Sequence, residues 1–464
     1  MMADLHRQCG PSHWSTLQQI EDWDGFASAL ESEATWLQEI LDSGPVRQPE
    51  RVLTFLHGLW QGDPDLHQRP IDRSMATACA LAFGMTNVKA EVMSARFEYY
   101  RDSHAAGLLN SCYAGLSTWE RRFLARGCQW GFLADTQSLT FLRNTITWPR
   151  AQYTKACWQA PYRSFNCLGD TVQGPEYYRP FRGSFVAAPQ MVITVGGVCG
   201  ALSNLGASAA MANGIPAATM GEPGHCAYTV KIDDKTWQPA YSLSWKRSLH
   251  TSFYSASWPG LMLTEACYSD EAAMAKSSDL ARRAHAEEAA GDLDRAGWLW
   301  KQALKAHGLN FNLWEEWAAY GERTNQGPEW WNIFHDALLE GLGGHEEPTW
   351  SLLSRHVYPR LLKGLDTPAR HKLFMDWVRE LNTWGGGRWN VEGAWDWMLK
   401  ELATDHHAEL VRSIGDEVLD SSDFGPPYVS WLLTRYSPES PEWDSILSGI
   451  VKASRTGEEG HAAL

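Results

Sequence analysis

The chain has 464 residues, of which 44% are hydrophobic, so it is long enough to hold two or three domains with apolar cores. Its formal net charge of -15 and its pI of about 5.5 disfavour a nucleic-acid partner, because phosphate binding needs clustered Lys and Arg. The opening residues contain no apolar h-region, and the chain contains no run of about 18 apolar residues. We therefore expect neither a secretory signal nor a membrane partner.

The cysteines indicate a reducing compartment. There are nine of them, an odd number, and none lies in a CxxC pair, which disfavours both a disulfide framework and a zinc ribbon. We expect a cytoplasmic protein with no metal site and no required cofactor. All nine cysteines lie at or before Cys267, and this shift in composition indicates a domain boundary near that point.

The N-terminal part of the chain has the apolar spacing of helices. Trp36, Leu37, Ile40 and Leu41 recur at helical intervals, and similar amphipathic runs follow. We expect an N-terminal helical region over residues 1–145. Between residues 146 and 190, prolines and glycines punctuate a segment rich in tyrosine and tryptophan, which predicts loops.

A compact core is predicted next. Met191–Val195 is a short β-branched run of the kind found in strands, and two glycines end it. Cys199–Asn213 is small, apolar and helix-like, and Gly214 stands where a left-handed cap is expected.

Extended segments follow this predicted helix. Residues 215–220 are expected to be extended and residues 221–224 to form a turn. The alternating runs 227–232 and 236–241 flank Asp233-Asp234 and predict a β-hairpin. A helix that precedes antiparallel strands indicates an α+β core over residues 146–270.

The last part of the chain is predicted to be helical again. The segment GDLDRAGWLWKQAL matches the second half of a tetratricopeptide unit, and later segments keep aromatic helical spacing without a fixed period. We expect a C-terminal helical-hairpin domain over residues 271–454, which offers a surface for a protein partner. Residues 455–464 are expected to be a disordered tail.

Cys199 and His225 are the candidates for chemistry. A thiolate is the reactive form of cysteine, and it is favoured by the dipole and free N–H groups at a helix N-terminus. A neighbouring imidazolium favours the thiolate further. Glycines on both sides, including Gly197, leave the sulfur uncovered, and the N–H of Cys199 is placed to stabilise an oxyanion.

The segment GGVCGALSNLGASAAMANGIPAATMGEPGHCAYTVKIDDKTW resembles the core of the transglutaminase-like cysteine enzymes, within the papain-like class. The resemblance covers about residues 190–245. It implies that Cys199 is the nucleophile, that residues 214–217 form the helix exit, that His225 is the base and that Trp237 ends the hairpin.

One residue of that family pattern is missing. The family usually carries an aspartate shortly after the tryptophan to orient the histidine, but Trp237 is followed here by Gln238-Pro239-Ala240-Tyr241-Ser242. A neutral partner for the imidazole is chemically acceptable. Tyr241, Gln238 or Ser242 is one source of it, Asp170 is another, and a catalytically weak site is the third alternative.

The loop before the core supplies candidates for substrate binding. Arg179 or Arg182 is suited to a substrate carboxylate, and Gln173 or Gln190 to an oxyanion. The alternative is that this loop only caps the domain. The candidate substrate-binding residues are Gln173, Tyr178, Arg179, Gly197 and Trp237, with Trp148 and Trp158 as further candidates for the wall of an acyl channel. Cys226 is expected to alternate to the other face of its strand and to serve packing.

The resulting expectation is acyl transfer at an amide through a thioester. The enzyme would be a cysteine peptidase or amidase, or an acyltransferase of transglutaminase type, and its substrate a peptide, a protein or a small amide. The first alternative is a catalytically degenerate module that binds peptides or proteins. The second is an architectural protein in which Cys199 is buried.

Overall fold

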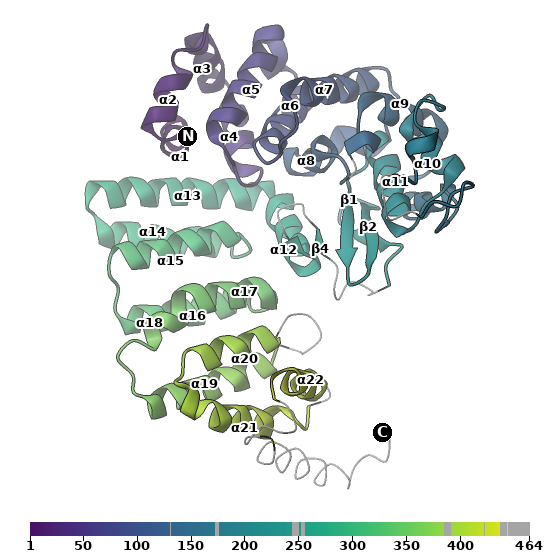
Figure 1. Cartoon of the computed structure of the whole chain (residues 1–464). Coiled ribbons are helices and arrows are strands. Elements are labelled where there is room, and N and C mark those ends of the chain that lie inside the picture. The colour runs from purple at the N-terminus through teal and green to yellow at the C-terminus, as the bar shows by residue number, and fades with distance from the viewer. Residues whose placement is uncertain are drawn as a thin grey trace. The chain divides into compact units, whose positions relative to one another are not determined.

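A computed structural model describes residues 1–129, 131–171, 176–243, 250–251, 256–384, 391–421, 423–436 and 443. Over these residues the protein is mostly helical and contains a small antiparallel sheet (Figure 1). The chain divides into two compact units. Unit 1 comprises Met1–Leu261 and Tyr268–Arg282, and unit 2 comprises Met262–Cys267 and the described residues from Arg283 onward.

Unit 1 begins with helices and continues into the sheet. Its α-helices are α1 Met2–Cys9, α2 Pro11–Leu17, α3 Trp23–Ser32, α4 Ala34–Asp42, α5 Pro49–Gly62, α6 Pro70–Phe83, α7 Ala90–Ala105, α8 Thr118–Arg126, α9 Thr136–Thr145, α10 Ala188–Val195 and α11 Cys199–Ala212. Its 3-10 helices are η1 Pro64–Gln68, η2 Ser111–Gly115, η3 Gly131–Leu133, η4 Arg150–Gln159 and η5 Arg179–Phe181. Helices α12 Trp258–Ser269 and α13 Glu271–Ala290 contribute residues to both units.

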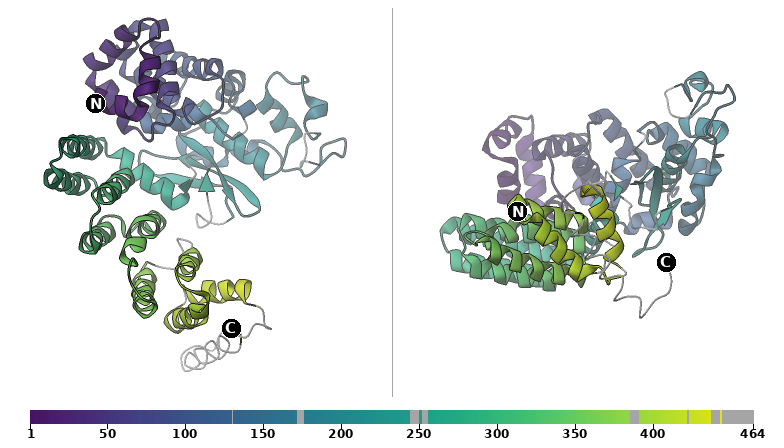
Figure 2. Two further views of the ribbon diagram at one scale, coloured as in Figure 1. Left: turned by 60° about the vertical axis from the view of Figure 1, so that its left-hand side comes forward. Right: turned by 60° about the horizontal axis from the view of Figure 1, so that its bottom comes forward.

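The sheet has the strand order β3-β2-β1-β4-β5, and every pair is antiparallel. Its strands are β1 Ala217–Glu222, β2 His225–Lys231, β3 Trp237–Ala240, β4 His250–Thr251 and β5 Ala256–Ser257. In the β1–β2 pair, Glu222 lies directly opposite His225, so the hairpin loop between them is only Pro223-Gly224. Helix α11 packs against β1 and β2, which lie beside it in teal in Figure 2.

The hairpin and the helix cap agree with the sequence prediction, but one predicted strand is wrong. Gly214 has a φ of +76° after α11, as a left-handed cap requires. Residues 191–195, predicted as a strand, form part of α10. Pro189 stands in the first turn of α10, which favours a helix start, and Met191, Val192 and Val195 are buried at helical intervals. The cysteine is therefore preceded by a helix.

One apolar core joins the N-terminal helices to the sheet. Its buried residues run from Leu5 in α1 to Ala240 in β3. The phenols of Tyr99 and Tyr100 in α7 donate to the main-chain carbonyls of Ala212 and Met211 at the end of α11, at 2.7 and 3.0 Å. The residues predicted as a helical region and those predicted as a catalytic core thus share one unit.

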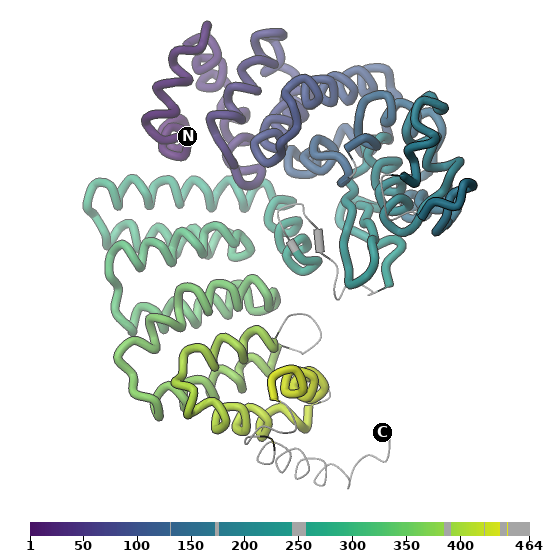
Figure 3. Tube along the Cα trace, viewed as in Figure 1, coloured from purple at the N-terminus to yellow at the C-terminus, as the bar shows by residue number. Residues whose placement is uncertain are grey.

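Unit 2 is a succession of helices that follow one another as neighbours, as the trace in Figure 3 shows. Tryptophans and other aromatic residues fill its core; Trp317, Trp331 and Phe334 are examples. Its helices are α14 Leu293–Ala306, α15 Phe311–Arg323, α16 Pro328–Leu342, α17 Glu346–Leu352, the π-helical turn η6 Leu353–Val357, α18 Tyr358–Leu361, α19 Thr367–Asn382, α20 Val391–Lys400, η7 Thr404–His406, α21 His407–Val418 and α22 Gly425–Arg435.

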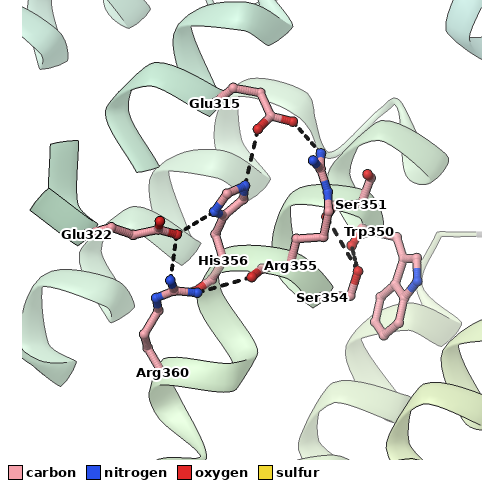
Figure 4. Close-up of polar contacts among 8 residues, drawn as sticks. All are labelled: Glu315, Glu322, Trp350, Ser351, Ser354, Arg355, His356 and Arg360. Atoms are coloured by element: carbon pink, nitrogen blue, oxygen red, sulfur yellow. Dashed lines mark hydrogen bonds and ion pairs between the residues drawn. The ribbon is translucent and has the colours of Figure 1, made fainter. Parts of the chain in front are cut away.

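Within unit 2, a charged network ties α15 to the π-helical turn (Figure 4). His356 lies between two carboxylates, with Nδ1 2.7 Å from Glu322 Oε1 and Nε2 3.2 Å from Glu315 Oε2. Arg355 pairs with Glu315, and Arg360 pairs with Glu322 at 2.6 Å.

Among the described residues, no helix combines the length and apolar character needed to cross a membrane.

Candidate active site

Cys199 is the first residue of α11, and its side chain is partly exposed. The preceding residue, Val198, gives no side-chain cap, so no cap side chain occupies the N–H groups of the first turn. Gly197 has no room for a side chain, because a Cβ there would lie 2.7 Å from Tyr178 Oη and 2.5 Å from Ala201 Cβ. Glycine at this position therefore lets the backbone approach closely beside the cysteine.

Backbone and tyrosine contacts hold the segment that leads into Cys199. Gly197 donates its N–H to the Pro161 carbonyl at 3.2 Å and accepts from the Arg163 N–H at 2.9 Å. The phenol of Tyr178 donates to the Gly196 carbonyl at 2.8 Å, and burial raises the pKa of this tyrosine. Tyr178 thus positions the loop before the cysteine.

His225 begins β2 and is oriented by a main-chain carbonyl. Its Nε2 lies 2.8 Å from the carbonyl oxygen of Tyr241, whose φ of +55° is unusual for a residue with a side chain. A carbonyl can only accept, so Nε2 carries a proton and the basic lone pair of the neutral ring is on Nδ1. Tyr241 was predicted as a neutral orienting partner, and the group in contact is its backbone oxygen. Its ring also packs edge-on against the imidazole, with ring centroids 4.8 Å apart.

Glu222 is a carboxylate beside His225 that the sequence analysis missed. Its Oε1 lies 3.8 Å from His225 Nε2, and its side chain is only 1% exposed. It also accepts from the Leu243 N–H at 2.7 Å and from Ser242 Oγ at 3.3 Å. Ser242 therefore contacts this carboxylate. The signal in the sequence was the two-residue turn Pro223-Gly224, because a hairpin closed there sets Glu222 opposite His225.

Cys226 lies on the face of β2 that packs against α11. Ser203 in α11 donates to the Cys226 carbonyl at 2.7 Å. The thiol of Cys226 interacts with that of Cys199, and the pKa of Cys226 is raised by burial and, to a smaller extent, by Cys199. The strand places the side chain of the even-numbered residue, Cys226, against the helix start.

The described contacts join His225 to Glu222 and Tyr241, but they include no hydrogen bond between His225 and Cys199. His225 packs against the ring of Tyr241, and Cys199 lies near enough to this tyrosine to affect its pKa. Burial, then the nearby Tyr162 and Cys199, raise the pKa of Tyr241 to about 12. We call the group formed by the start of α11 and β2, the end of β1 and the residue after β3 the thiol cluster; its members are Cys199, Cys226, Glu222, His225 and Tyr241.

Two other proposed orienting groups lie elsewhere. Gln238 has an exposed side chain on β3, and its carbonyl accepts from Thr229 Oγ1 at 3.0 Å. Asp170 accepts from the side-chain amide of Asn166 at 3.1 Å within its own loop. The described contacts bring neither residue to His225.

The proposed substrate-binding residues are scattered. Trp237 is buried, with its ring centroid 4.7 Å from that of Phe123 in α8, so it serves the core. Arg179 is exposed and pairs with Glu176 at 3.1 Å. Gln173 lies outside the described residues. Of the alternatives in this loop, Arg182 is exposed and Gln190 accepts from the Val186 N–H at 3.1 Å.

Exposed aromatic rings border the thiol cluster. Trp158 is 58% exposed, and its ring centroid lies 5.0 Å from that of Tyr241. Tyr162 is 55% exposed and forms a parallel β-bridge with Gly197, two residues before the cysteine. Trp148 instead packs against Tyr153. Trp158 and Tyr162 thus present apolar surface beside Cys199.

Among the described residues, no group of three or more His, Cys, Asp or Glu side chains is arranged to hold a metal ion. Comparisons with protein-family models, with curated proteins and with solved structures found no match for this chain. The geometry of the thiol cluster is therefore the basis for inferring a function.

Proposed function

We propose that the protein is a thiol-dependent amide hydrolase or acyltransferase, with Cys199 as its nucleophile. The observation that carries this proposal is a partly exposed thiol at an uncapped helix N-terminus, within one cluster with an oriented imidazole. A helix N-terminus stabilises a thiolate, and an imidazolium does so further. We also propose that the core has the transglutaminase-like arrangement.

The proposed reaction proceeds through a thioester. Cys199 loses its proton to Nδ1 of His225 and attacks the amide carbonyl carbon, and N–H groups at the start of α11 stabilise the oxyanion. The C–N bond then breaks as the imidazolium gives its proton to the leaving amine. Water, or a second amine, cleaves the thioester and regenerates the thiol. The first step needs a Cys199–His225 hydrogen bond that the structure does not record, and catalytic hydrogen bonds commonly form only in the substrate complex.

The surroundings favour an acyl group with apolar or aromatic character. Trp158 and Tyr162 flank the thiol cluster with exposed rings, and such rings bury apolar substrate surface. Arg179 is paired with Glu176 in solvent, so nothing in the described contacts assigns it to a substrate carboxylate. We therefore propose an aromatic or large aliphatic acyl side as the preferred substrate.

Trapping the thioester tests this proposal. The protein is mixed with 4-nitrophenyl phenylacetate, and the site of acylation is read by mass spectrometry after digestion with trypsin and chymotrypsin. We expect a nitrophenolate burst and a hydroxylamine-labile acyl group on the peptide that contains Cys199. Cys199→Ser should abolish both, whereas Cys167→Ser, which removes an exposed thiol, should leave them unchanged. Acylation confined to Cys167 or to lysines would overturn the proposal.

The alternative function is a binding module without catalysis. It is favoured by the absence of a recorded Cys199–His225 hydrogen bond and by the exposed rings of Trp158 and Tyr162. A binding module predicts no thioester. It also predicts that Trp158→Ala loses a bound peptide that Cys199→Ser retains.

A further inference from the structure

The thiol cluster contains two cysteines, and both lie on the seam between α11 and β2. On β2 the even-numbered side chains face α11, because a Cβ on Gly206 of that helix would lie 2.6 Å from Cζ of Tyr228. Cys226 is two residues before Tyr228 and so lies on the same face of the strand.

Cys199 lies on the face of α11 that packs against β2. Ser203, whose hydroxyl donates to the Cys226 carbonyl at 2.7 Å, is four residues after Cys199 and shares its helix face. The two thiols interact directly in the structure. Both thiols therefore lie on the faces of α11 and β2 that pack together.

Accessibility separates this pair from most other cysteines of the chain. Cys199 and Cys226 are partly exposed, whereas Cys9, Cys79 and Cys157 are buried. Cys128 and Cys267 are also buried. A small oxidant therefore has access to two thiols that already face each other.

We propose that Cys199 and Cys226 are a redox-active pair that a hydroperoxide converts into a reversible disulfide. The formation of this disulfide is independent of the proposed acyl-transfer function. Only its consequence, the loss of the Cys199 nucleophile in the oxidised protein, rests on that function.

The chemistry balances with hydrogen peroxide as the oxidant. The Cys199 thiolate attacks one peroxide oxygen, the O–O bond breaks, and the departing hydroxide takes a proton to become water. The product is a sulfenic acid on Cys199. The sulfur of Cys226 then attacks the Cys199 sulfur, the S–O bond breaks, and a second water leaves. Two thiols are oxidised by two electrons in total, and one peroxide is reduced to two waters.

The order of the two steps follows from the surroundings of each thiol. Burial raises the pKa of Cys226, and the neighbouring Cys199 and Glu222 raise it further, so Cys226 stays protonated longer. Cys199 has the helix N-terminus instead, which favours its thiolate. Cys199 is therefore the thiol that meets the oxidant, and Cys226 resolves the product.

Peptide mapping tests the disulfide in the unmodified full-length chain. No Lys or Arg occurs between Arg182 and Lys231, so trypsin leaves both cysteines in one peptide, whereas chymotrypsin separates them by cleaving after Leu202 and Leu205. The protein is treated with equimolar peroxide, blocked with iodoacetamide in denaturant and digested with both proteases. We expect the two peptides to remain joined without reductant and to separate with dithiothreitol.

The controls distinguish this proposal from the acyl-transfer function. Oxidation should lower the native labelling of Cys199 at least tenfold, with full recovery in dithiothreitol, while the labelling of Cys167 serves as the reference. In Cys226→Ala, we expect a sulfenic acid on Cys199 that dimedone traps, and no joined peptides. Sulfinic acid on Cys199 in the wild type without joined peptides, or a disulfide between Cys199 and Cys167, would overturn the pair. If the pair forms but no thioester does, the acyl-transfer function fails alone; if a thioester forms but the pair does not, only the redox proposal fails.

Discussion

Two oxygen atoms lie near Nε2 of His225, the neutral carbonyl oxygen of Tyr241 and a carboxylate oxygen of Glu222. The Tyr241 carbonyl is 2.8 Å from Nε2, and Glu222 Oε1 is 3.8 Å from the same nitrogen. A carbonyl fixes which nitrogen is protonated, whereas a carboxylate favours the charged ring. The two groups therefore have separable roles: Tyr241 orients the imidazole, and Glu222 supplies a negative charge near it.

Removing the charge of Glu222 should weaken the activation of Cys199. In Glu222→Gln, the amide keeps an acceptor for the Leu243 N–H but no longer favours an imidazolium. We predict that the alkylation of Cys199 at about pH 6 becomes about tenfold slower, because the imidazolium that favours the thiolate is less favoured. Rates of iodoacetamide labelling from pH 5 to 9 measure the change. Glu176→Gln, which neutralises an exposed carboxylate paired with Arg179, should leave the profile in place; equal profiles for Glu222→Gln and wild type would contradict the role of Glu222.

Some of the thiol cluster was predictable from single residues. The glycines before Cys199 and the hairpin after His225 indicated both positions, and Tyr241 was among the orienting candidates. Glu222 was missed because its neighbours Gly221, Pro223 and Gly224 favour a turn, and only the pairing register sets it opposite His225. Cys226 is expected from the sequence only to serve packing, because alternation along β2 does not reveal which face of the strand packs on α11.

At the level of elements, local composition predicted the structure correctly where a residue with a clear backbone preference marked a helix end or a turn. Gly214 marked the end of α11, and Asp233-Asp234 marked the turn between β2 and β3. The β-branched residues 191–195 were misread as a strand because strand propensity is weak and tertiary packing overrides it. Pro189 and the buried face of α10 decided the outcome.

The π-helical turn η6 carries a pH-dependent contact within unit 2 (Figure 4). The pKa of His356 is raised, chiefly by its hydrogen bond with Glu315 and also by Glu322, and these effects outweigh the opposing effect of burial. Because the folded pKa is above the unfolded one, this contact stabilises the fold fully below the unfolded histidine pKa of roughly 6.5. Its stabilisation is lost as pH rises through the raised folded pKa.

The variant His356→Gln isolates this contact. We predict that wild type exceeds His356→Gln in unfolding free energy most at about pH 5, and that the difference shrinks toward about pH 9. Urea unfolding at a series of pH values measures it. The difference between the two proteins removes the titration of other groups, such as His335, whose pKa is also raised. A difference that stays constant or grows with pH would show that His356 does not act through its charge.

At the scale of the whole molecule, the core that positions the thiol cluster includes both the N-terminal helices and the sheet of unit 1. Tyr99 and Tyr100 bind the end of α11, and Glu120 in α8 pairs with the buried Lys231 of β2. Apolar spacing predicted the N-terminal helices, but it does not reveal which helices share a core. Long-range contacts of this kind leave no local signature in the sequence.

This shared core predicts which fragments fold. We expect residues 1–282 to unfold cooperatively by circular dichroism on heating, and residues 146–270 alone to show no cooperative transition. The shorter fragment lacks the α7 tyrosines and leaves Lys231 without Glu120, and an unpaired buried charge costs roughly 3–5 kcal/mol. A cooperative transition in residues 146–270 would contradict the single core.

The activation of the Cys199 thiol by His225 is the central claim, and the pH-dependent rate of its alkylation tests it most directly. Native protein is labelled with iodoacetamide, and peptide mapping follows Cys199 and the exposed Cys167 in the same sample. We predict that Cys199 reacts at pH 6 at least about tenfold faster than Cys167, because an ordinary thiol is almost fully protonated there. His225→Gln should remove this advantage. Equal, ordinary thiol profiles for Cys199 and Cys167 in both proteins would contradict the claim.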